Sequence, residues 1–123
     1  MISENLELRI VRDESSYRLF YMDNTNVAVL FGVSPSIINK IYKEIDRAIN
    51  KKVTRAIEWE QVEDVETYTC SIYPKYNRKT NTIMITINND DYNGYHTTNK
   101  FIITTAKAKE LNQHLFDEYQ LLK

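Results

Sequence analysis

The chain has 123 residues, of which 42% are hydrophobic and 27% are charged. These values predict one compact globular domain that folds without a metal or a disulfide, and the lone cysteine, Cys70, excludes an intrachain disulfide and suits a reducing compartment. The longest apolar run, Val27 to Val33, is too short to cross a membrane, and Glu4 and Glu7 interrupt the first ten residues where a signal peptide is apolar. We therefore predict a cytoplasmic protein with no membrane partner.

Charge is unevenly distributed along the chain, although the net charge is only −1. Six basic residues and two acids lie between Ser34 and Arg55, five acids and no bases between Ala56 and Ser71, and three bases and no acids between Ile72 and Asn89. A local basic surface binds phosphate even when the whole chain is nearly neutral. The pattern therefore favours a nucleic-acid partner more than the net charge does.

The first third of the chain predicts a hairpin followed by an ambiguous apolar segment. Alternating apolar residues over Leu6–Ile10 and a second extended run over Tyr17–Met22, separated by a polar turn, predict two paired strands. Val27–Val33 fits a strand by its residue types and a short buried helix by its spacing. Ser34 then caps a helix that has Pro35 in its first turn and runs to about Asn50.

The second half predicts a similar order of elements. A polar connection from Lys51 to Asp64, with a helical turn near Ala56–Trp59, leads to strands over Val65–Tyr73 and Thr82–Asn88. A short strand over Lys100–Ile103 and a helix from Thr104 or Thr105 to about Leu122 complete the chain. Because each half places strands before a capped amphipathic helix, we predict one domain, 1–123, built from two structural repeats, 1–52 and 65–123.

The segment from Asn26 to Glu44 resembles the helix-turn-helix of the lac repressor family. Ala28 is the small residue of a first helix, Gly32 occupies the tight turn, Val33 fills it, and Ser34 caps the second helix. This resemblance implies that the second helix lies in a DNA major groove. The predicted fold class is α+β: a winged helix-turn-helix-like pseudo-twofold domain with a central antiparallel β-sheet and outer helices.

The predicted DNA contacts follow from this motif and are all polar or basic. Serine, asparagine and lysine side chains at the start of the second helix are placed to contact base edges, and the later bases to contact phosphates. A basic hairpin with Tyr73 and Tyr76 resembles the wing of a winged helix, and the last helix is a weaker second site. The predicted DNA-binding residues are Ser34, Ser36, Asn39, Lys40, Lys43, Arg47, Lys51, Lys52, Lys75, Arg78, Lys79, Lys107, Lys109 and Asn112.

Size, duplicated halves and the motif at Asn26–Ile41 together are similar to the TraN type of small accessory protein from Gram-positive conjugative plasmids. That resemblance implies a double-stranded DNA-binding role in conjugative transfer beside a type IV secretion system, and no catalysis. The predicted oligomeric state is a monomer with internal pseudo-symmetry or a weak dimer. With two glycines, one cysteine and two separated histidines, the sequence predicts no phosphate loop, no metal site, no cofactor and no enzyme.

Two alternatives stay open from the sequence. If Val27–Val33 is a strand, each half has the order β-β-β-α, which is similar to the Whirly and transcriptional-coactivator fold, and the nine tyrosines supply stacking surfaces for a single-stranded nucleic acid. The other alternative is a protein-binding module or inhibitor that uses its Tyr and Asn surfaces and binds no nucleic acid.

Overall fold

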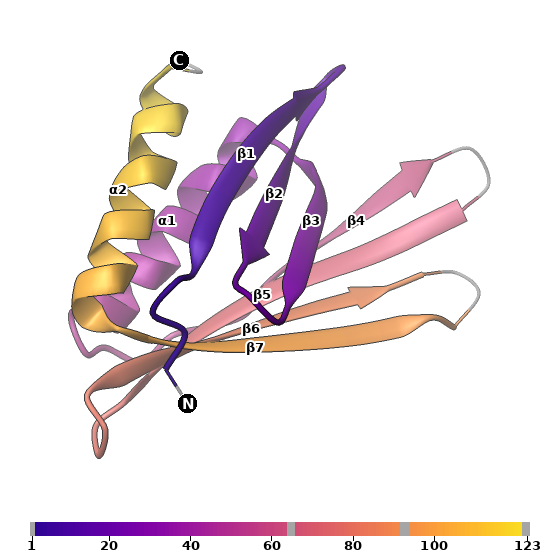
Figure 1. Ribbon diagram of the computed structural model, residues 1–123. Coiled ribbons are helices and arrows are strands. Elements are labelled where there is room, and N and C mark those ends of the chain that lie inside the picture. The colour runs from indigo at the N-terminus through magenta and orange to yellow at the C-terminus, as the bar shows by residue number, and fades with distance from the viewer. Residues whose placement is uncertain (1, 64–65, 92–93, 122–123) are drawn as a thin grey trace.

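The computed structural model describes residues 2–63, 66–91 and 94–121, which form seven strands and two helices (Figure 1). In chain order these are β1 (Glu7–Asp13), β2 (Ser16–Met22), β3 (Val27–Val33), α1 (Pro35–Ile49), β4 (Ile57–Glu63), β5 (Glu66–Asn77), β6 (Thr82–Asp90), β7 (His96–Thr104) and α2 (Thr105–Leu121).

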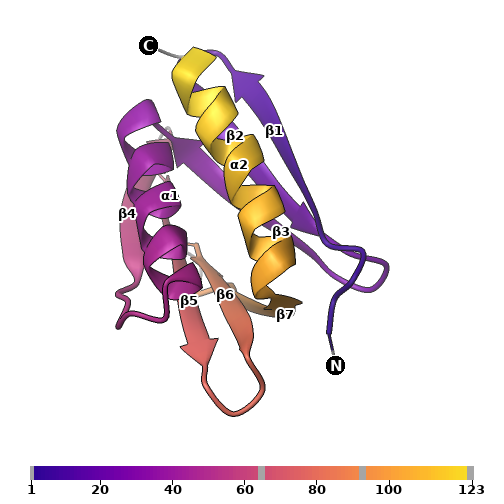
Figure 2. The same cartoon turned by 90° about the vertical axis from the view of Figure 1, so that its left-hand side faces the viewer.

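The strands form two antiparallel sheets, one with the order β1-β2-β3 and the other with the order β4-β5-β6-β7. Both helices and the three-stranded sheet lie on the same side of the four-stranded sheet, and the helices run side by side (Figures 1 and 2). The core between these layers is apolar, and its largest fully buried side chains include Tyr21, Phe101 and Ile38. The opposite face of the four-stranded sheet is not covered by either described helix.

The structure contradicts the predicted helix-turn-helix, because Val27–Val33 is strand β3. Its residues pair with β2, with Tyr21 opposite Ala28 and Leu19 opposite Leu30. Valine, leucine and phenylalanine suit a pleated and partly buried strand, and here that preference prevails over the helical spacing. The predicted winged domain with a central sheet and outer helices is therefore wrong; the chain is an α+β protein with two sheets and a pair of helices.

Gly32 makes a bulge in β3 and not a turn between helices. Leu19 lies opposite Leu30 but Tyr17 lies opposite Val33, so β3 contains one more residue than β2 over this stretch. Gly32 has a φ of 61°, the left-handed conformation that glycine adopts at little cost and that one type of β-bulge requires. The glycine requirement seen in the sequence is real, but its physical reason is a strand irregularity.

The predicted polar connection from Lys51 to Asp64 contains β4, so the helical turn expected near Ala56–Trp59 is also wrong. Ile57 and Trp59 alternate with acids and lie opposite Ile72 and Cys70 of β5, where they pack against the core. The acids face away from the core and mask the two-residue period in the sequence. β4 lies between the two predicted repeats, 1–52 and 65–123, and each of these has three strands before its helix.

The other predicted elements are confirmed, with longer strands than expected in the second half. Both predicted helix caps form: the Ile37 N–H donates to Ser34 Oγ at 3.2 Å, and the Lys107 N–H donates to Thr104 Oγ1 at 3.1 Å. Neither helix in the described ranges is long and apolar enough to span a bilayer.

Candidate nucleic-acid interface

The end of α1 presents two lysines in a fixed turn. The Lys51 N–H donates to the Ala48 carbonyl and the Lys52 N–H donates to the Arg47 carbonyl, at 3.0 and 2.9 Å, which is the Schellman pattern of helix termination. Lys51 has a φ of 62°, in the position where glycine is usual. A lysine there is strained relative to glycine, so the fold holds this cation in place at a cost in stability.

The segment after the turn is tied to both α1 and β5. The Arg47 guanidinium donates two hydrogen bonds to the Val53 carbonyl at 3.0 and 3.3 Å, and its Nε lies 3.8 Å from Glu44 Oε1. Thr54, which is buried, donates its hydroxyl to the Pro74 carbonyl. These bonds place Lys51 and Lys52 beside the basic end of β5.

The hairpin of β5 and β6 extends beyond the neighbouring strand β4. The β4 pairing ends with Ile57 opposite Ile72, so Pro74 lies past the point where its missing N–H would be needed for the β4 ladder. At the tip, the Lys79 N–H donates to Asn77 Oδ1 at 3.0 Å, and the Tyr76 hydroxyl donates to Asn81 Oδ1 at 2.7 Å. The hairpin is therefore an ordered projection with basic side chains.

The helix end and the hairpin enclose two adjoining hollows, which we call the basic groove. The larger hollow is about 760 Å³ and the smaller about 190 Å³, and they share Lys75 and Tyr76. Neither hollow is lined by an aspartate or glutamate of the described chain, and none of the groove cations belongs to an ion pair found among the described residues. The cations of the basic groove are Lys51, Lys52, Lys75, Arg78 and Lys79.

Apolar and aromatic side chains form the remaining surface of the basic groove. Met84 and Ile102 are cross-strand partners on the uncovered face of the four-stranded sheet, and Ile2 adjoins them. The half-buried Tyr73 lines the smaller hollow, and the Lys51 ammonium lies 5.8 Å from the centroid of the Tyr76 ring. The groove therefore combines fixed positive charge with surfaces on which a planar ring can stack.

The structure brings together only the predicted DNA contacts that lie in the basic groove. On α1, Ser34 is the helix cap, Arg47 holds the segment after the helix, and Asn39 is half-buried. Ser36, Lys40 and Lys43 lie on the same helix but line neither hollow. α1 packs beside α2 and both sheets, and Ser36, Lys40 and Lys43 are exposed on its outer side.

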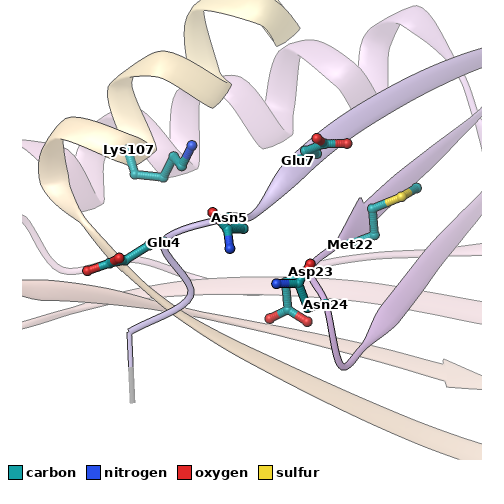
Figure 3. A pocket seen from close by; sticks show the side chains of 7 residues that line it. All are labelled: Glu4, Asn5, Glu7, Met22, Asp23, Asn24 and Lys107. Carbon is teal, nitrogen blue, oxygen red and sulfur yellow. The ribbon is translucent and has the colours of Figure 1, made fainter.

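The predicted contacts on α2 have different environments. Lys107 pairs with Glu110 at 3.2 Å and lines a pocket of about 470 Å³ together with Glu4, Glu7 and Asp23 (Figure 3). In that pocket the Asp23 carboxylate accepts the N–H groups of Thr25 and Asn26, and the first of these bonds lowers the pKa of Asp23 most. An acidic neighbourhood repels phosphate, so this pocket is a poor nucleic-acid site.

Lys109 is exposed, but Asn112 is only 4% exposed and cannot reach an external ligand. Its Nδ2 donates to the Tyr42 carbonyl at 3.1 Å, beside the contact of the Tyr42 and Phe116 rings, whose centroids are 5.1 Å apart. Asn112 therefore connects the two helices.

We expect Asn112→Ala to lower the free energy of unfolding by about 1–3 kcal/mol, because it removes a buried hydrogen bond and leaves a space between the helices. Denaturant titration measures this loss. Nucleic-acid affinity measured well below the unfolding transition should stay at the wild-type value. A stable variant with reduced affinity would instead assign Asn112 to a binding surface.

The groove residues that the sequence did not single out are mainly apolar: Ile2, Val53, Met84 and Ile102. Val53 is 86% exposed, which is unusual for an aliphatic side chain. Met84 and Ile102 alternate with buried neighbours along β6 and β7, so their position on the outer face follows once the strands are known to be long.

Comparison of the chain with protein-family models, with curated proteins and with solved structures finds no match. The resemblance to conjugative accessory proteins therefore stays a prediction, and the first part of the motif on which it partly depended, Val27–Val33, is a strand.

Proposed function

We propose that this protein binds single-stranded nucleic acid, with the basic groove as its principal contact. The observation that carries the proposal is the gathering of five cations around apolar and aromatic surface, with no carboxylate among the described residues that line it. Phosphates bind such cations, and the unstacked bases of a single strand bind aromatic and apolar side chains.

A single strand suits the groove better than a duplex does. Tyr73, Met84 and Ile102 contact only bases that are free to turn toward the protein, and the bases of a duplex are stacked inside it. The first helix of the predicted helix-turn-helix is strand β3, so α1 lacks the partner helix of that DNA-binding motif. These points favour the single-strand alternative over duplex recognition.

The uncovered face of the four-stranded sheet offers a path away from the basic groove. By strand alternation, Ser71, Thr86 and Thr98 lie on this face with Lys100, and their hydroxyl groups can bond to phosphate or base edges. The order of elements also supports the proposal, because the first half has the β-β-β-α order that is similar to the Whirly and transcriptional-coactivator fold.

The test is a titration with fluorescent oligonucleotides of one sequence in single-stranded DNA, single-stranded RNA and duplex forms. We expect at least about tenfold tighter binding, about 1.4 kcal/mol, to one single-stranded form than to the duplex. We also expect the affinity to fall as salt is added. Each phosphate contact with a single strand contributes about −0.7 to the slope of log affinity against log salt concentration. If all five groove cations contact phosphate, the slope should be about −3.5.

Equal or tighter duplex binding would contradict the single-strand proposal. Failure to bind any of the three forms at low salt would reject a nucleic-acid role and favour the protein-binding alternative.

A further inference from the structure

A small aromatic pocket lies at the other end of the four-stranded sheet from the basic groove. The groove is lined by residues of the turn between β5 and β6, whereas Asp90, Asp91 and Tyr95 of this pocket lie where β6 ends and β7 begins. Figure 1 shows that these are opposite ends of the sheet. Its volume is about 160 Å³, and Phe31, Tyr68, Tyr95 and Asp91 line it. The pocket and the basic groove share no residue.

The aromatic side chains reach the pocket from three different strands or turns. Phe31 belongs to β3, and its carbonyl accepts the indole N–H of Trp59 at 2.8 Å, which fixes β3 against the four-stranded sheet. Phe31 is 39% exposed and Tyr95 is 73% exposed. Large aromatic surface is left facing solvent at the pocket, where folding alone would favour burying it.

Negative charge and hydrogen-bond acceptors accompany the rings. Asp91 and Asp90 both line the pocket, and no lysine or arginine of the described chain lines it; the Asp90 carboxylate is already paired with His96. Asn89 donates its amide N–H to the Val29 carbonyl at 2.8 Å, which leaves its buried Oδ1 with no donor among the described residues. The Asp91 carboxylate and Asn89 Oδ1 therefore suit a ligand that donates hydrogen bonds and carries positive charge.

We propose that this pocket binds the guanidinium group of an arginine side chain from another protein molecule. A guanidinium is a planar cation with five N–H donors, so it stacks on aromatic faces and bonds to carboxylate and amide oxygens at the same time. The pocket is small, about 160 Å³, which suits the end of one side chain better than a larger ligand.

The direct test is an NMR titration of the full chain with N-acetyl-arginine amide, and with the citrulline analogue as the neutral control. We expect saturable shifts confined to residues around Phe31, Tyr68 and Tyr95, and none with citrulline. Asp91→Asn keeps the Oδ1 that accepts the Tyr95 N–H at 2.7 Å but removes the charge, and should weaken binding about fivefold. Asp46→Asn, an exposed acid on α1, is the matched control and should leave the affinity unchanged.

Two sources of the arginine are distinguished by sedimentation of the protein over a range of concentrations. Self-association that is weakened by both Asp91→Asn and Arg78→Gln assigns the arginine to the hairpin of a second copy. A monomer that still binds the arginine probe assigns it to a different protein.

Absence of saturable shifts in the folded protein, or equal shifts with citrulline, overturns the proposal. Because the pocket lies apart from the basic groove, that result leaves the nucleic-acid proposal untouched.

Discussion

Reversing two charges in the basic groove, Lys75→Glu with Arg78→Glu, should weaken single-strand binding at low salt at least about a hundredfold, or about 2.7 kcal/mol. Both side chains are exposed at the hairpin, and Lys75 lines both hollows, so the double variant places two carboxylates where phosphates are expected to bind. The salt dependence should also decrease, because each lost phosphate contact removes about 0.7 from the slope. Fluorescence anisotropy at several salt concentrations measures both effects.

The matched control is Lys40→Glu with Lys43→Glu, which changes the net charge by the same amount on the outer side of α1. These lysines line neither hollow, so the control should lose only the small part of the affinity that depends on overall charge. Equal losses in the two double variants would mean that the groove has no special role.

A companion variant, Lys51→Gly, separates binding from folding. Glycine relieves the left-handed backbone at this position, so we expect stability to rise by up to about 1 kcal/mol while affinity falls with the loss of a cation. A change that stabilises the fold and weakens binding cannot act through unfolding.

The sequence predicted the local elements well where the pattern had one interpretation. The hairpin of β1 and β2 and the caps at Ser34 and Thr104 depend on neighbouring residues, and all of them form. Val27–Val33 had two interpretations, and its outcome depends on β2 being available to pair with it. Pairing with β2 involves residues outside the segment, so the spacing of residues within the segment cannot predict it.

Strand β4 was missed because its outward residues are acids. Glu58 and Glu60 made the segment resemble a solvated connection, although Ile57 and Trp59 alternate with them and pack on the core. An amphipathic strand of this kind contains as many charges as a linker, and only the two-residue period distinguishes them.

The basic groove was predictable in its parts but not in its geometry. The lysines after α1 and the basic hairpin were both expected to bind phosphate, as two separate parts of a winged helix. The bond from Thr54 to the Pro74 carbonyl joins them into one surface, and it connects residues that are twenty positions apart. This bond from the Thr54 hydroxyl to a main-chain carbonyl could not be foreseen without knowing that β5 passes the end of α1.

Gly32→Val should lower the free energy of unfolding by about 3 kcal/mol or more, because backbone strain and a steric clash add at this position. Valine at a φ of 61° is strained by its branched side chain, which costs about 1–3 kcal/mol. A Cβ at this position would also lie 2.1 Å from Gln61 Oε1 and 3.0 Å from Gln61 Cβ, so the Gln61 side chain would have to turn away and its Cβ to shift slightly. Thermal and denaturant unfolding measure the loss.

Gly94 provides the control that separates strain from packing. It too has a positive φ, 81°, but a Cβ there would have no atom of the described residues within 4 Å, so Gly94→Val should show the backbone cost alone. The excess loss in Gly32→Val then reports the contact with Gln61, and Gln61→Ala in the same chain should recover part of it. Because the Gln61 Oε1 is buried with no partner among the described residues, the single change Gln61→Ala should cost little.

Equal losses at the two glycines, with no recovery from Gln61→Ala, would contradict the close approach of β3 to β4. Glycine is therefore needed at position 32 because a bulged strand passes directly over the neighbouring sheet, a requirement that is compatible with Val27–Val33 being extended.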